Sequence, residues 1–106
     1  MLRVELVFDR DCPNVGRARA MIRAALGEVG ADAVWSEWDR ADAATPAELR
    51  SYGSPSVLVN GKDVDANEVV RSDANSCRVY MDDCGCVCGA PSAWLIVRAI
   101  RLAQAA

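Results

Sequence analysis

The sequence predicts a single α/β domain over residues 1–106, in which helices flank a mixed central sheet. Three observations carry this prediction. An apolar strand pattern at 3–8 changes to helical spacing at Val15, a second strand pattern follows at 33–38, and a hairpin signal spans 57–64. The β–α–β order makes the first two strands parallel, and the hairpin adds antiparallel strands. With 106 residues, 52% of them hydrophobic, the chain suits one compact domain.

The first strand and the first helix are the clearest elements. Apolar side chains alternate along Arg3–Phe8, and Val7 makes the second face apolar as well, which predicts a central strand. From Val15 the apolar residues recur at steps of three and four, which predicts a helix. This helical stripe consists of Val15, Ala18, Ile22, Ala25, Leu26 and Val29. Either Gly27 or Gly30 ends the helix.

A second strand and a short helix are expected next. Residues 33–38 form the strand, which lies parallel to the first. Thr45 and Glu48 have the spacing of a capping box, and Pro46 occupies the first helical position. Gly53 ends this helix.

Hairpin and helix signals continue to the end of the chain. Two strands, 57–59 and 62–64, flank an Asn60-Gly61 turn. We expect a loop over 65–76 and a short strand over 77–81. Pro91-Ser92 caps a last apolar helix from Ala93 to about Ala103.

Composition excludes several classes of function. A net charge of −3 without a cluster of basic residues argues against nucleic acid as a partner. No apolar run approaches the ~18 residues of a membrane span, and the first residues do not form a signal peptide, so we expect no membrane association and a cytoplasmic location. Histidine is absent, which excludes an imidazole general base and a mixed cysteine and histidine metal site.

Cys12 lies where the first strand gives way to the first helix. A helix N-terminus stabilises a thiolate over a thiol, so this position predicts a reactive sulfur. The neighbouring Arg10 favours the thiolate, whereas Asp9 and Asp11 oppose it. The alternative is a small, buried and inert thiol. In a reducing compartment, five cysteines, an odd number, indicate reactive thiols or metal ligands better than a disulfide framework.

A second sulfur-rich segment lies near the end of the chain. It contains Cys84, Cys86 and Cys88. In an extended conformation these three sulfurs face the same way, and Gly85 and Gly89 let the backbone wrap an ion. Such a triad suits Zn(II), Cu(I) or Hg(II), although Zn(II) prefers a fourth ligand, which Cys77 or Cys12 would have to supply. The alternatives are incidental thiols in a loop, or disulfides formed on oxidation.

The order strand, cysteine-headed helix, strand, helix, proline-led hairpin and helix resembles the thioredoxin superfamily. The segment 12–15, Cys-Pro-Asn-Val, stands where that superfamily has its Cys-x-x-Cys motif, and 54–57, Ser-Pro-Ser-Val, stands where it has a cis-proline. The resemblance covers residues 1 to about 64 and the last helix. With 60–64 and 76–80, these motifs are similar to small bacterial thioredoxin-like proteins, some labelled glutaredoxin-like or organomercurial-lyase-associated.

The resemblance implies thiol–disulfide exchange at Cys12. Because Val15 replaces the second cysteine of the motif, Cys12 would act as a monothiol with glutathione, be resolved by Cys77, or bind a soft metal. The resemblance also implies substrate contacts along the groove next to Cys12, formed by Pro13, Ser54 and Pro55. The expected partner is a small molecule or protein that carries a thiol or disulfide. Metal binding by the distal cysteines, and an interaction module without chemistry, remain alternatives, and the sequence does not determine the oligomeric state.

Overall fold

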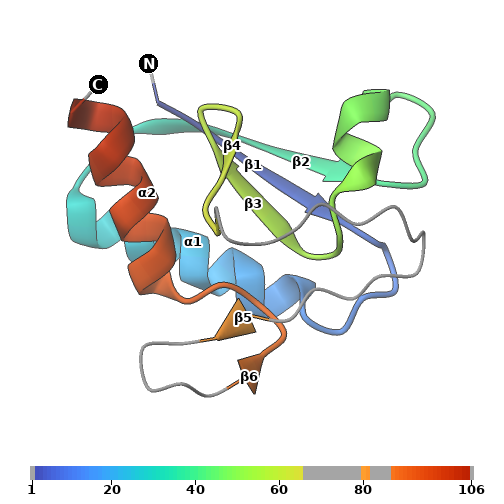
Figure 1. Cartoon of the computed structure of the whole chain (residues 1–106), viewed down its shortest axis with the longest axis horizontal. Helices are drawn as coiled ribbons and strands as arrows, with labels where there is room; N and C mark the ends of the chain where they lie inside the picture. The colour runs from blue at the N-terminus through green and yellow to red at the C-terminus, as the bar shows by residue number, and fades with distance from the viewer. Residues whose placement is uncertain (1, 66–79, 82–86, 106) are drawn as a thin grey trace.

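The computed structural model describes residues 2–65, 80–81 and 87–105, and within them it confirms the α/β class. A mixed four-stranded sheet has the order β2-β1-β3-β4 (Figure 1). Its strands are β1 (Leu2–Phe8), β2 (Ala33–Asp39), β3 (Ser56–Val59) and β4 (Lys62–Asp63). As predicted, β1 and β2 are parallel, whereas β3 is antiparallel to both β1 and β4.

Two helices, α1 (Val15–Val29) and α2 (Ala93–Ala105), pack against each other and against β1 (Figure 1). The buried side of α1 is the predicted apolar stripe, and Ile22 at its centre is fully buried. Burying one such side chain stabilises the fold by roughly 1.5–3 kcal/mol. In the part of the chain that the structure describes, neither helix is long and apolar enough to cross a bilayer.

β1 is buried on one face along its centre, and towards its carboxyl end it is buried on both faces. Val4 and Leu6 belong to the core beneath the helices, and both are 0% exposed. Val7 points to the other face of the sheet, where it is also 0% exposed, and Leu58 of β3 shares that face at 1%. β1 is therefore the rigid centre of the sheet, and the loop at its carboxyl end is well supported.

The helix ends follow local signals. Of the two glycines considered for the end of α1, Gly30 is the correct one, because it is left-handed with φ 69° and its N–H donates to the Leu26 carbonyl at 2.9 Å. Ser92 caps α2 as expected, since its Oγ accepts a hydrogen bond from the Leu95 N–H at 3.3 Å. α2 continues to Ala105, slightly beyond its predicted end.

The predicted capping box is wrong. The segment forms a 3₁₀ helix, η1 (Ala47–Ser51), preceded by Pro46, and it has no side-chain cap. Thr45, only 3% exposed, instead donates its hydroxyl hydrogen bond to the Asp39 carbonyl at 2.5 Å. The hydroxyl of Thr45 thus stabilises the β2–η1 loop and does not cap the helix. The helix ends before Tyr52.

The hairpin is confirmed in detail. Asn60 and Gly61 have positive φ values of 50° and 83°, as a type I′ turn requires. Beyond it, a small antiparallel pair joins β5 (Tyr80–Met81) to β6 (Val87–Cys88). β5 lies in the predicted strand 77–81, whose first residues, like the predicted loop after Asp65, lie outside the described residues.

Candidate functional site

Cys12 lies in the loop between β1 and α1, two residues before the helix N-cap Asn14. Its N–H donates to the Asp9 carbonyl at 3.0 Å, and its own carbonyl accepts the Val15 N–H at 3.5 Å. The predicted junction is therefore correct, although Cys12 precedes the helix rather than standing in its first turn. The side chain of the N-cap residue Asn14 makes no capping hydrogen bond to the first turn of α1.

The thiol of Cys12 is half-buried. It packs against the hydrophobic core on one side, while the next residue, Pro13, is exposed. Cys12 forms no disulfide with another described cysteine. Its partial exposure is compatible with attack on a substrate and differs from the fully buried, inert alternative.

A hydrogen bond joins the Cys12 loop to the residue before Pro55. The Asp9 N–H donates to Ser54 Oγ at 2.9 Å. Because the Asp9 carbonyl in turn accepts the Cys12 N–H, a continuous path of hydrogen bonds runs from Ser54 to Cys12. The structure therefore brings two of the predicted site segments, 12–13 and 54–55, to the same end of the sheet, where β1 ends and β3 begins (Figure 1).

The turn that carries Ser54 is itself buried and tightly bonded. Ser54 is 1% exposed, and Pro55 is fully buried. The Ser54-Pro55 peptide bond is cis, as the resemblance implies. Ser56 Oγ donates to the Gly53 carbonyl at 2.6 Å. The turn is therefore a fixed, buried part of the fold beside the Cys12 loop.

Two ion pairs neutralise charges beside Cys12. Arg40 Nη1 contacts Asp9 Oδ2 at 2.9 Å, and Arg10 Nε contacts Asp39 Oδ2 at 3.0 Å. The Arg40 side chain is only 8% exposed and also donates to the Arg50 carbonyl at 3.2 and 3.3 Å. Asp9 was expected to oppose a thiolate at Cys12, but the guanidinium of Arg40 offsets its charge.

The chain that follows β6 lies against the start of α1. A Cβ added at Gly89 would come within 2.5 Å of Asn14 Cγ, so the backbone of Gly89 touches the Asn14 side chain. Ala90, at 2% exposure, joins Val15 in the hydrophobic core. This contact brings the backbone that follows Cys88 close to the helix start that follows Cys12.

The other cysteines predicted to act at a site lie mostly outside the residues that the structure describes. Cys77, Cys84 and Cys86 are outside the described residues, and of Cys88 only the backbone is described, as the last residue of β6. Within the described residues, no group of three metal-ligating side chains comes together. The resolving role of Cys77 and the metal site of the cysteine cluster therefore stay predictions.

Comparison with known protein families, curated proteins and solved structures finds no match. The candidate site therefore depends on the geometry around Cys12. Sequence reasoning missed Arg40, because its partner Asp9 is 31 residues away and no local spacing links them. It also missed the contact of Gly89 with Asn14, where the absence of a side chain lets the two residues touch, while the predicted role of Gly89 beside a metal stays a prediction.

Proposed function

We propose that this protein carries out thiol–disulfide exchange with Cys12 as its nucleophile. The observation that supports this most directly is the hydrogen-bonded path from Ser54 through Asp9 to Cys12. It holds a half-exposed thiol in a fixed position beside the buried turn that carries Pro55. α1 begins three residues after Cys12, and the positive end of its helix dipole attracts anionic groups there.

The order of elements supports a thioredoxin-like fold for this proposal. β1, α1, β2, η1, β3, β4 and α2 follow one another in the order that the resemblance implies, and the β5–β6 pair is inserted before the last helix. The cysteine and the Ser54-Pro55 turn occupy corresponding places in that order. Fold alone does not establish activity, so the proposal depends on the site.

The chemistry begins with one exchange step. The Cys12 thiolate attacks one sulfur of a substrate disulfide, the disulfide bond breaks, and the second substrate sulfur leaves as a thiolate. The protein then carries a mixed disulfide at Cys12. A second thiolate, from glutathione or from a downstream cysteine such as Cys77, attacks the Cys12 sulfur. The substrate sulfur leaves as a thiolate, and Cys12 is left in a disulfide with glutathione or with the downstream cysteine. Val15 excludes the local second cysteine of a dithiol motif.

A variant that keeps only Cys12 tests the proposal. Serine replaces the other four cysteines, which are Cys77, Cys84, Cys86 and Cys88. We expect this protein to react with iodoacetamide near neutral pH several-fold faster than a free cysteine, whose pKa is ~8.5. With glutathione disulfide it should gain one glutathione by mass and release one. A reaction no faster than that of free cysteine would contradict the proposal.

The matched control is Cys12→Ser with the other four cysteines retained. It should lose the fast reaction while keeping the same fold by circular dichroism. If it instead keeps the fast reaction, the nucleophile is a downstream cysteine and Cys12 is not the site. Mass spectrometry of both variants with Zn(II), Cu(I) and Hg(II) also tests the predicted metal site, because only Cys12→Ser retains the cluster.

A further inference from the structure

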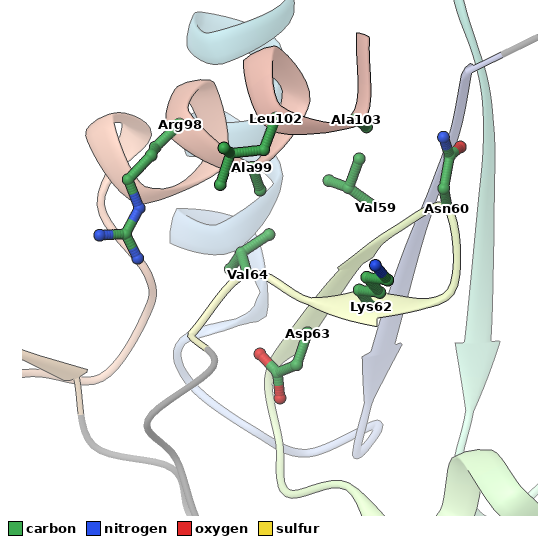
Figure 2. A pocket seen from close by; sticks show the side chains of 9 residues that line it. All are labelled: Val59, Asn60, Lys62, Asp63, Val64, Arg98, Ala99, Leu102 and Ala103. Carbon is green, nitrogen blue, oxygen red and sulfur yellow. The ribbon is translucent and has the colours of Figure 1, made fainter. Parts of the chain in front are cut away.

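A groove between α2 and the β3–β4 hairpin lies apart from the Cys12 site. It encloses about 320 Å³ (Figure 2). Its apolar lining comes from Val59, Val64, Ala99, Leu102 and Ala103. Val59 and Val64 are each 3% exposed, whereas Leu102 is 67% exposed. The large apolar side chain of Leu102 is thus exposed next to buried apolar residues, an arrangement typical of a ligand site.

The hairpin wall of this groove is held in place from both sides. Asn60 Oδ1 accepts the Arg3 N–H at 2.9 Å, and the Asn60 N–H donates to the Arg3 carbonyl at 2.9 Å. At the other end of the hairpin, the Val64 N–H donates to the Val57 carbonyl at 3.0 Å. Because the wall is fixed before any ligand arrives, little conformational entropy is lost on binding.

The charges around the groove are mainly positive. Lys62 and Arg98 both line it, and among the described residues neither forms an ion pair. Arg98 lies over the Trp94 ring, 5.0 Å from its centroid. The single acidic group, Asp63, already accepts the Asp65 N–H through Oδ1 at 3.0 Å. Figure 2 shows Lys62 on the hairpin and Arg98 on the helix, on either side of the apolar lining.

We propose that this groove binds a small amphipathic carboxylate, with its apolar chain between Val64 and Leu102 and its carboxylate near Lys62. A volume of 320 Å³ lies at the lower end of the range for small-ligand sites, which suits a short-chain carboxylate such as octanoate. The apolar lining excludes a fully polar anion, and the cations disfavour an ammonium.

This site is independent of the proposed thiol chemistry. β3 runs antiparallel to β1, with Val4 opposite Val59 and Val7 opposite Ser56. Val59 and the groove therefore lie at the end of the sheet where β1 begins, whereas Cys12 follows the end of β1. Failure of one proposal leaves the other untouched.

Titration of the full-length, reduced protein with octanoate, followed by amide chemical shifts, tests the proposal. We expect saturable shifts at Val64, Ala99 and Leu102. Octan-1-ol should bind about three- to five-fold more weakly, because it offers Lys62 no negative charge, and octyltrimethylammonium should bind more weakly still, because Lys62 repels its positive charge. No saturable shift with octanoate would overturn the proposal, as would equal binding of the three compounds.

Two variants locate the ligand. Leu102→Glu places a negative charge at the mouth of the groove and should weaken octanoate binding at least ten-fold, and Lys62→Gln should weaken it about three- to five-fold. Val34→Glu is the matched control, because Val34 is also exposed, at 50%, but lies on β2 at the opposite edge of the sheet. If Leu102→Glu binds octanoate as the control does, the carboxylate site is not in this groove.

Discussion

The backbone N–H of Asp9 donates to the side-chain oxygen of Ser54 across 45 residues of sequence. The bond ties the β1–α1 loop, which carries Cys12, to the turn that precedes β3. Ser54 is 1% exposed, so this hydrogen bond is shielded from water. The position of Cys12 relative to the Pro55 turn therefore depends on one hydroxyl group.

Replacing Ser54 with alanine should both destabilise the protein and change the reactivity of Cys12. The Asp9 N–H would lose its acceptor, and a buried unsatisfied donor costs about 1–3 kcal/mol. We expect the free energy of unfolding, measured by urea denaturation, to fall by that amount. Because the Cys12 N–H bonds to Asp9, the alkylation rate of Cys12 should fall as well.

Ser51→Ala is the control for this prediction. Ser51 is exposed, and its hydroxyl donates only to the Glu48 carbonyl at 2.9 Å within η1. Its loss should change stability by less than about 0.5 kcal/mol and leave Cys12 alkylation unchanged. Equal effects of the two substitutions would show that the Ser54 bond does not position the loop.

Arg40 should matter more for stability than Arg10, although each pairs with one aspartate. The side chain of Arg40 is 8% exposed, and it serves both Asp9 and the Arg50 carbonyl. Arg40→Met leaves these acceptors without their donor, so we expect a loss of about 1.5–3 kcal/mol in thermal or urea unfolding. Arg10 is 84% exposed, and Arg10→Met should cost at most about 1 kcal/mol. The reverse ranking would contradict this assignment.

Arg19 offers a prediction on pH. Its hydrogen bonds to Glu37, at 2.8 and 3.1 Å, raise the pKa of Arg19 above its usual value. Partial burial opposes this rise, and the charge of Glu37 adds to it. A raised pKa of a cation stabilises the fold below the unfolded pKa, and the contribution is lost as pH rises through the folded pKa. Both pKa values lie above the usual working range, so the contribution is present throughout that range.

Arg19→Gln should therefore lower the free energy of unfolding by less than about 1 kcal/mol, equally at about pH 6 and about pH 9. The pair is exposed, so the difference should shrink when urea unfolding is repeated in high salt. Arg17→Gln, on the exposed part of the same helix, gives the baseline for losing an arginine. If Arg19→Gln lowers the free energy of unfolding at the lower pH but not at the higher one, the raised pKa of Arg19 is wrong.

The elements that were predicted correctly are those whose signals lie among residues close together in the sequence. The apolar stripe of α1 and the Asn60-Gly61 turn are local patterns, and both appear as expected. Thr45 shows where local reasoning fails. Its spacing to Glu48 matches a capping box, but a tertiary hydrogen bond to the Asp39 carbonyl takes its hydroxyl.

The candidate site divides in the same way. The junction at Cys12 follows from a change of periodicity, and the place of Ser54 follows from the resemblance. Arg40 could not be predicted, because an ion pair between residues 31 apart leaves no periodic signal. The contact between Gly89 and Asn14 joins two segments that are far apart in the sequence. Only the folded structure reveals why position 89 needs a residue without a side chain.

That contact gives a stability prediction. In Gly89→Ala, the new Cβ would lie within 2.5 Å of Asn14 Cγ and 2.7 Å of Oδ1, so the amide or the backbone must move. Such overpacking typically costs about 1–3 kcal/mol, which urea unfolding would measure. The displaced segment precedes the buried Ala90, and a shift there would also disturb the start of α1 next to Cys12.

A double-mutant cycle with Asn14→Ala tests whether Gly89→Ala loses stability through a clash with the Asn14 side chain or through a change in the backbone at residue 89. If the Asn14 amide is the obstacle, its removal makes room for the new methyl group, and the double variant should recover most of the stability that Gly89→Ala loses. The coupling energy should then be about 1–2 kcal/mol. Purely additive effects would mean that Gly89 does not lie against Asn14. The alkylation rate of Cys12 should follow the same pattern, falling in Gly89→Ala and recovering in the double variant. The reason is that the segment after β6 packs against the start of α1, close to Cys12 in the sequence.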